Sequence, residues 1–88
     1  MDTEEFERWR GEADRALEGG RLQAAAGLHN WACFAAEQAA QLAMKALLHG
    51  LGRGPSGIHY GESDAAEALG DAEAVLRFVD ETWGGLRG

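Results

Sequence analysis

The stretch that most constrains the fold is "NWACFAAEQAAQLAMKALLHGLG", residues 30–52. It has only two formally charged side chains, Glu37 and Lys45, although 26 % of the whole chain is charged. Alanine and leucine dominate and valine and isoleucine are scarce, which favours helix over strand. Because polar side chains recur about once per turn, a membrane span is excluded. A helix apolar on most sides must be contacted on most sides, so residues 29–51 are predicted as a central helix.

A first amphipathic helix is predicted over about residues 3–25. Asp2 and Glu5 form a capping-box-like pair at its start, and the following acids suit a helix N-terminus. Gly19–Gly20 either lies within one helix, bent or closely approached there, or breaks it. "AGLHN", with Gly27, predicts a short turn into the central helix. The predicted core stripe of this helix is Phe6, Trp9, Ala13, Leu17, Gly20 and Ala24.

A third helix is predicted over about residues 63–83. "GLGRGPSG" ends the central helix with four glycines and the only proline. Ser63 is the candidate N-cap, and Gly84–Gly85 are expected to stop the helix. Phe78 and Val75 are expected to widen its apolar face from the flank. The predicted core stripe is Ala65, Leu69, Ala72, Leu76, Val79 and Trp83.

Three such helices define one domain, residues 1–88, with an all-α fold: a small up-down bundle. Two flanking helices cover only part of the central helix, whose small residues permit close approach, so a second copy is expected to complete the core as a homodimer or higher oligomer. The amide of Gln38 is expected to bond across the bundle or the dimer. The residues predicted at the core or dimer interface are Trp31, Phe34, Ala35, Gln38, Ala39 and Leu42.

The net charge of −7 is unevenly distributed. Residues 1–18 carry −4 and residues 61–88 carry −5, whereas residues 19–60 carry +2. Acidic flanks would repel phosphates, which disfavours broad nucleic-acid binding. The lone Cys33 cannot form an internal disulfide, and the charged first 18 residues do not resemble an export signal, so a cytoplasmic location is expected.

Several segments together resemble the HEPN domain family. The first helix offers Trp9, Ala13 and Leu17, and the last helix resembles the family's closing segment over residues 67–79. The second helix offers an aromatic, alanine-rich run followed by Gln-Ala-Ala and a Lys-Ala-Leu-Leu ending. These matches lie at Trp31 to Phe34, at Gln38–Ala39–Ala40 and at Lys45–Ala46–Leu47–Leu48.

The resemblance implies a non-catalytic interaction module that works with a minimal nucleotidyltransferase in a toxin–antitoxin or stress-defence system. Two departures stand out. The extra helical sequence that relatives carry before the last helix is reduced here to "RGPSGIHYGE", and Gln41 stands where many members have an acid.

The alternative that the resemblance implies is a metal-independent ribonuclease toxin. Ribonuclease members use an Arg, four to six residues and a His, often followed by Tyr, and this chain has Arg53, His59 and Tyr60 at that spacing. His59 would act as general acid/base and Arg53 would stabilise the phosphate. Glycines and a proline surround the pair, so no helix can hold both side chains on one face.

A polar strip on the second helix is the other candidate site. Glu37, Gln41, Lys45 and His49 follow one another four residues apart. They form either a ligand or partner groove or a solvated stripe supported by i,i+4 pairs. The histidines and the single cysteine do not cluster at ligand spacing, so no metal site and no cofactor are predicted.

Overall fold

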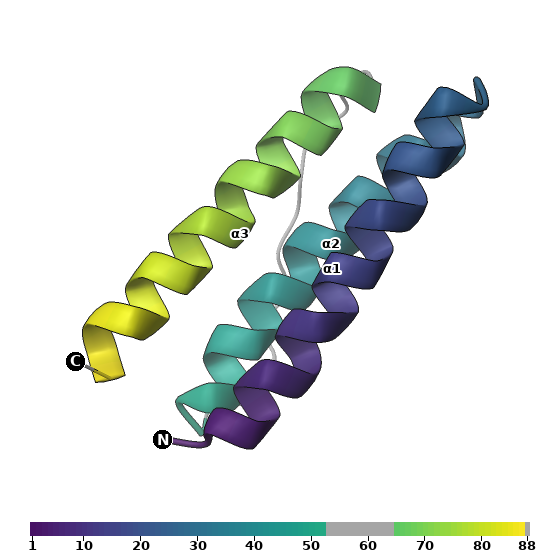
Figure 1. Cartoon of the computed structure of the whole chain (residues 1–88). Coiled ribbons are helices and arrows are strands. Elements are labelled where there is room, and N and C mark those ends of the chain that lie inside the picture. The colour runs from purple at the N-terminus through teal and green to yellow at the C-terminus, as the bar shows by residue number, and fades with distance from the viewer. Residues whose placement is uncertain (53–64, 88) are drawn as a thin grey trace.

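The computed structural model describes residues 1–52 and 65–87, which form three helices. They are α1 (Thr3–Ala25), α2 (His29–Gly50) and α3 (Ala65–Arg87) (Figure 1). The all-α class and the three helices are confirmed, and no strand occurs in the described residues. None of the three helices is long and apolar enough to cross a bilayer, as far as residues 1–52 and 65–87 go.

The start of α1 follows the sequence prediction. The Asp2 carboxylate accepts a hydrogen bond from the backbone N–H of Glu5 at 3.1 Å, which caps the helix. The reciprocal half of a capping box is not made. Instead the backbone N–H of Asp2 donates to the carbonyl of Gly50 at 2.7 Å, which ties the start of α1 to the end of α2.

Gly19–Gly20 does not break α1, which is continuous from Thr3 to Ala25. A Cβ at Gly20 would lie 3.1 Å from the Leu69 side chain and 3.3 Å from Ala35 Cβ. Glycine therefore lets α2 and α3 approach α1 closely at this level.

The turn between α1 and α2 is a Schellman motif centred on Gly27, whose φ is 81°. The N–H of Leu28 donates to the carbonyl of Gln23 at 2.8 Å, and the N–H of Gly27 donates to that of Ala24 at 3.0 Å. These bonds satisfy carbonyls that the end of α1 leaves free. The tight turn makes α1 and α2 antiparallel neighbours, as predicted.

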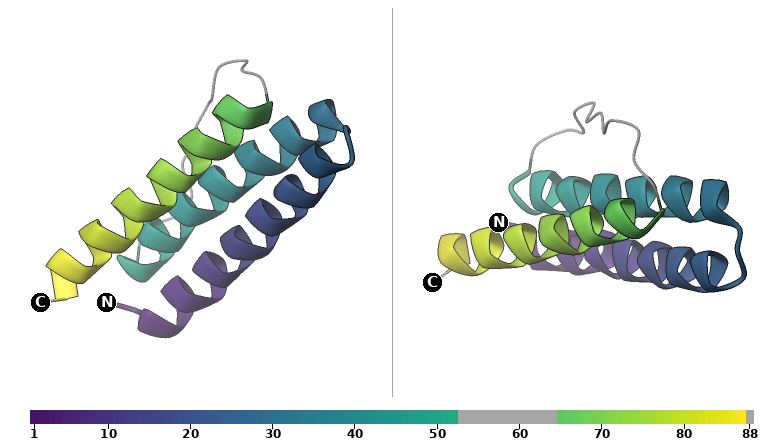
Figure 2. Two further views of the ribbon diagram at one scale, coloured as in Figure 1. Left: turned by 45° about the horizontal axis from the view of Figure 1, so that its top comes forward. Right: turned by 90° about the horizontal axis from the view of Figure 1, so that it is seen from above.

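In an up-down bundle, consecutive helices run in opposite directions. α1 and α2 do so, whereas α3 does not run opposite to α2. Gly20 of α1 and Ala35 of α2 lie beside Leu69 near the start of α3, and Gly50 at the end of α2 lies beside Trp83. α3 therefore runs parallel to α2 and antiparallel to α1, and both termini lie at one end (Figures 1 and 2). The chain between the end of α2 and the start of α3 must therefore span about the length of α2. A 22-residue helix is about 33 Å long, and twelve residues, the number in segment 53–64, can reach about 40 Å, so the connection is long enough.

The core lies between the three helices, and α2 contributes mainly alanine to it. Alanines 36, 39, 40 and 43 are essentially inaccessible to solvent because α1 and α3 already cover them. Ala39, predicted at the core or the dimer interface, is thus in the core of the single chain. The buried cluster comprises Phe6, Ala13, Leu17, Ala36, Ala39, Ala40, Ala43, Ala46, Leu47, Ala68, Ala72, Leu76, Val79 and Trp83.

The predicted end of α3 at Gly84–Gly85 is wrong, because the helix continues to Arg87. Each glycine costs about 1 kcal/mol relative to alanine but does not forbid helix, and buried Trp83 holds the preceding turn in place. On the flank of the core stripe Val75 is partly buried and Phe78 is exposed. The proposed N-cap, Ser63, lies outside the described residues.

Candidate functional site

Two large aromatic side chains at the start of α2 remain exposed to solvent. Trp31 is 61 % exposed and Phe34 is 56 % exposed. Both were predicted to lie in the core or at an interface, and neither is in the core of the single chain. Exposed aromatics are unremarkable when scattered, so what matters is whether they belong to a shared surface.

They do, since both line a groove between α1 and α2. The groove has a volume of about 510 Å³, and none of the described residues of α3 contributes to it. Alanine, leucine and the two aromatic side chains form its apolar lining, and Glu12 and Arg15, which also line it, form an ion pair of 2.7 Å. We call this surface the α1–α2 groove; its lining is Glu12, Arg15, Ala16, Gly19, Gln23, Trp31, Phe34, Ala35, Gln38 and Leu42.

Two amides lie among these apolar groups. Gln38, predicted to bond across the bundle or the dimer, lines the groove and is only partly buried. Gln23 also lines it, and its buried side-chain oxygen accepts no hydrogen bond from the described residues. A buried acceptor without a donor costs about 1–3 kcal/mol, so the groove contains polar groups that a bound surface can satisfy.

A second group of side chains surrounds Trp9, and we call it the Trp9 cluster: Glu5, Arg8, Trp9, Lys45 and His49. The His49 ring stacks on the indole, with centroids 4.8 Å apart and planes 10° apart. The Lys45 ammonium lies 5.8 Å and the Arg8 guanidinium 5.1 Å from the ring centroid, within the range of cation–π attraction. The indole N–H donates to the Glu5 carboxylate at 3.2 Å.

Glu5 is the acidic member of the Trp9 cluster. Its carboxylate accepts a 2.9 Å hydrogen bond from Arg8. That bond lowers the pKa of Glu5, the indole hydrogen bond acts in the same direction, and partial desolvation opposes both. The same pairing raises the pKa of Arg8. Glu5 therefore stays ionised and holds both Arg8 and the Trp9 indole in place.

The predicted polar strip on α2 is divided by the fold. Lys45 and His49 join the Trp9 cluster, whereas Glu37 and Gln41 line neither that cluster nor the α1–α2 groove. Trp9 was predicted only as a core residue, and Ala16, Gly19 and Gln23 were not singled out as site residues. These residues belong to a second stripe on α1, which recurs every three or four residues at positions 5, 9, 12, 16, 19 and 23. That periodicity could have identified them from the sequence.

The catalytic candidates Arg53, His59 and Tyr60 lie outside the described residues. Within residues 1–52 and 65–87, no three His, Cys, Asp or Glu side chains are grouped so that they could hold a metal ion.

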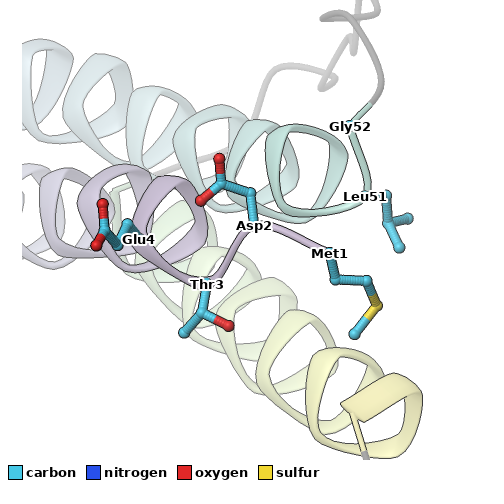
Figure 3. A pocket seen from close by; sticks show the side chains of 6 residues that line it. All are labelled: Met1, Asp2, Thr3, Glu4, Leu51 and Gly52. Atoms are coloured by element: carbon cyan, nitrogen blue, oxygen red, sulfur yellow. The ribbon is translucent and has the colours of Figure 1, made fainter.

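Two other hollows are not candidate sites. One, near the N-terminus, is lined by residues 1–4, Leu51 and Gly52. The side chains of Asp2, Thr3 and Glu4 point in different directions there, so they form no convergent site (Figure 3). The other lies between α1 and α3. There Arg10 binds both Asp14 and Asp80, and Arg21 binds Glu73, so these charges hold the two helices together.

The class defined by this geometry is a small helical bundle with an apolar groove on one side. The sequence model of the HEPN domain family matches residues 6–60, more than half of the chain. The chain therefore belongs to the HEPN domain family. Comparison with curated proteins and with solved structures gave no match.

Proposed function

We propose that the chain is a non-catalytic HEPN interaction module that acts by binding protein through the α1–α2 groove. The observation that carries this proposal is the exposure of Trp31 and Phe34 beside a groove of about 510 Å³. Tryptophan and other aromatics are enriched at the centres of protein interfaces, because they bury a large area with few rotatable bonds. HEPN domains commonly dimerise, which agrees with such a surface.

The charge distribution supports the same proposal. Among the described residues, the charged side chains that line the groove or belong to the Trp9 cluster are Glu5, Glu12, Arg8, Arg15 and Lys45, two acids and three bases, giving +1 with His49 neutral. The whole chain carries −7. Nearly balanced charge around an apolar centre suits a protein contact, since a strongly acidic face would repel another acidic protein.

The partner implied by family membership is a minimal nucleotidyltransferase, in a cytoplasmic toxin–antitoxin or stress-defence system. This part of the proposal rests on the resemblance of the sequence to the family. The ribonuclease alternative rests on the spacing of Arg53 and His59.

Sedimentation of the purified chain, alone and mixed with a minimal nucleotidyltransferase of the same genome, tests the module. We expect species heavier than the monomer, weakened at least tenfold by Phe34→Ser. Phe78→Ser is the matched control, because Phe78 is also 56 % exposed but lies on α3. A purely monomeric chain that binds no nucleotidyltransferase contradicts the proposal.

Incubation with a mixed RNA pool separates the two functions. We expect intact RNA with the parent protein and with His59→Ala. Cutting by the parent that disappears in His59→Ala would replace the interaction module by the ribonuclease.

A further inference from the structure

We propose that the α1–α2 groove takes a single amphipathic helix of a partner protein, and that a carboxylate on this helix binds Lys45. The bound helix would lie between α1 and α2, on the side to which no described residue of α3 contributes. The inference rests on the proposed function, since it specifies what kind of protein surface the groove binds.

The first argument is the spacing of residues along the groove. On each of its two helices one row of residues recurs at alternating steps of four and three. This average of about 3.5 residues is the spacing that keeps one face of a helix against a neighbouring helix over several turns. Every member of the two rows is half-buried or exposed. We call these rows the two seams: Glu5, Trp9, Glu12, Ala16, Gly19 and Gln23 on α1, and Trp31, Ala35, Gln38, Leu42, Lys45 and His49 on α2.

The two seams lie side by side and have the same length. Each runs over about 27 Å, from residue 5 to 23 on α1 and from residue 31 to 49 on α2. At one end of the pair the rings of Trp9 and His49 stack, and at the other end Gln23 and Trp31 both line the groove. One helix of about five turns is therefore long enough to contact both seams from end to end.

The shape of the groove favours a helix over other binding modes. Within residues 1–52 and 65–87 no strand offers an edge that an extended segment could join. A helix satisfies its own backbone hydrogen bonds, so it can be buried against an apolar surface. The groove also has room for it, because α1 contributes the small Ala16 and Gly19, and a Cβ added at Gly19 would meet nothing within 4 Å. A convex helix fills such a hollow, whereas the equally concave groove of a second copy would leave it unfilled.

Charge specifies the chemistry of the partner helix. The Lys45 ammonium lies 5.8 Å from the Trp9 ring centroid and forms no ion pair with the described residues. In the Trp9 cluster Glu5 stands against two cations, so the net charge is +1 while His49 is neutral. Lys45 lies one turn beyond the apolar part of the α2 seam. A carboxylate one turn beyond the apolar stripe of the partner helix would therefore complement this end.

A synthetic peptide of about five helical turns tests the proposal. Its own seam, at alternating steps of four and three, carries leucine at the central positions and glutamate at one end, with alanine and glutamine elsewhere. Its control is a scrambled peptide of the same composition. Fluorescence anisotropy of the labelled peptides measures their dissociation constants with the purified chain. We expect saturable one-to-one binding of the patterned peptide and at least tenfold weaker binding of the scrambled one.

Gly19→Leu should block the groove without disturbing the core. A Cβ at this position meets nothing within 4 Å, and leucine is a better helix former than glycine. We expect the dissociation constant of the patterned peptide to rise at least tenfold. Gly70→Leu is the matched control, because a Cβ at Gly70 on α3 also meets nothing within 4 Å, and it should leave the affinity unchanged. Equal affinities of the two variants would overturn the proposal.

Lys45→Gln tests the ion pair in a double-mutant cycle. Its partner is the peptide with glutamine in place of the terminal glutamate. We expect Lys45→Gln to weaken binding of the glutamate peptide about three- to fivefold, and to bind the glutamine peptide as the parent does. Equal binding of the glutamate peptide by parent and Lys45→Gln would overturn the role of the carboxylate.

The outcomes separate this proposal from the proposed function. If the patterned peptide does not bind while a nucleotidyltransferase still sediments with the chain, the helix is overturned and the interaction module stands. If the peptide does not bind while Gly19→Leu dissociates a dimer, the groove belongs to a second copy and the helix is again overturned. A chain that stays monomeric and binds neither peptide nor nucleotidyltransferase overturns the proposed function itself.

Discussion

The rings of Phe6 and Trp83 stack face to face, with centroids 4.3 Å apart and planes 7° apart. Phe6 lies in the second turn of α1 and Trp83 in the last third of α3, so the stack joins the two ends of the chain. Gly50, at the end of α2, lies against both residues. The close approach of three helices here depends on the missing side chain of a glycine.

Gly50→Ala should therefore destabilise the protein, although alanine is the better helix former. Its Cβ would lie 2.5 Å and 2.7 Å from two carbons of the Trp83 ring. We expect overpacking to lower the free energy of unfolding by about 1–3 kcal/mol. Chemical denaturation measures it, with Gly70→Ala as control, since nothing lies within 4 Å of a Cβ there. The control should be stabilised by about 0.5–1 kcal/mol; a stabilised Gly50→Ala would contradict the packing.

Leu76→Ala should remove much of the stability of the domain. Leu76 is buried in the core between α3 and the other helices, and truncating such a leucine costs about 2–5 kcal/mol. Leu22→Ala is the control, because Leu22 is an exposed leucine on α1, and we expect it to change stability by less than about 0.5 kcal/mol. If Leu76→Ala and Leu22→Ala have the same melting temperature, the core face of α3 is misassigned.

The bidentate contact between Arg10 and Asp80 should contribute to holding α3 on α1. Arg10 Nε and Nη2 donate to the two Asp80 oxygens at 2.8 Å and 2.9 Å, and these bonds raise the pKa of Arg10. A double-mutant cycle with Arg10→Met and Asp80→Asn should give a coupling energy of about 1 kcal/mol, discounted for the half-exposed Asp80. Coupling indistinguishable from zero at low salt would refute this contribution.

Glu5 should make stability depend on pH at the acidic end. Its pKa is lowered below the ordinary value of 4.5, so the unfolded chain takes up the proton first as pH falls. The contribution is complete above the ordinary value and disappears as pH falls through the lowered one. The melting temperatures of parent and Glu5→Gln should differ more at pH 7 than at pH 3. Glu7→Gln serves as control, and an equal pH dependence there would contradict the role of Glu5.

The helices could be predicted from the sequence because their signals are local. Asp2 as N-cap, Gly27 at positive φ and the 3.6-residue periodicity set the limits of α1 within the chain itself. The direction of α3 is not a local property. It depends on which face of the α1–α2 pair α3 covers and on whether the connection can cross the length of α2. The prediction that Gly84–Gly85 ends α3 was wrong because the packing of buried Trp83 outweighs the modest helix-propensity cost of the two glycines.

The candidate site was only partly predictable for a related reason. The pattern shows that Trp31 and Ala39 are both apolar positions of α2, but not what covers each of them. In the structure the chain's own helices cover Ala39, and Trp31 is left at the surface. Lys45 and His49 were identified as site candidates, yet their aromatic neighbour Trp9 comes from another helix, and a single stripe of residues does not report such a contact.

The turn at Gly27 also bears on the order in which the fold is assembled. α1 and α2 meet across a three-residue connection, so their contacts are local and form early, whereas the contacts of α3 join residues that are farther apart in the sequence and form later. We expect the α1–α2 hairpin to be the folding nucleus. Gly27→Ala, which strains a positive-φ position by about 1–2 kcal/mol, should then mainly slow refolding, and Leu76→Ala should mainly speed unfolding. Stopped-flow chevron plots of the two variants distinguish these effects, and the reverse pattern would place the nucleus on α3.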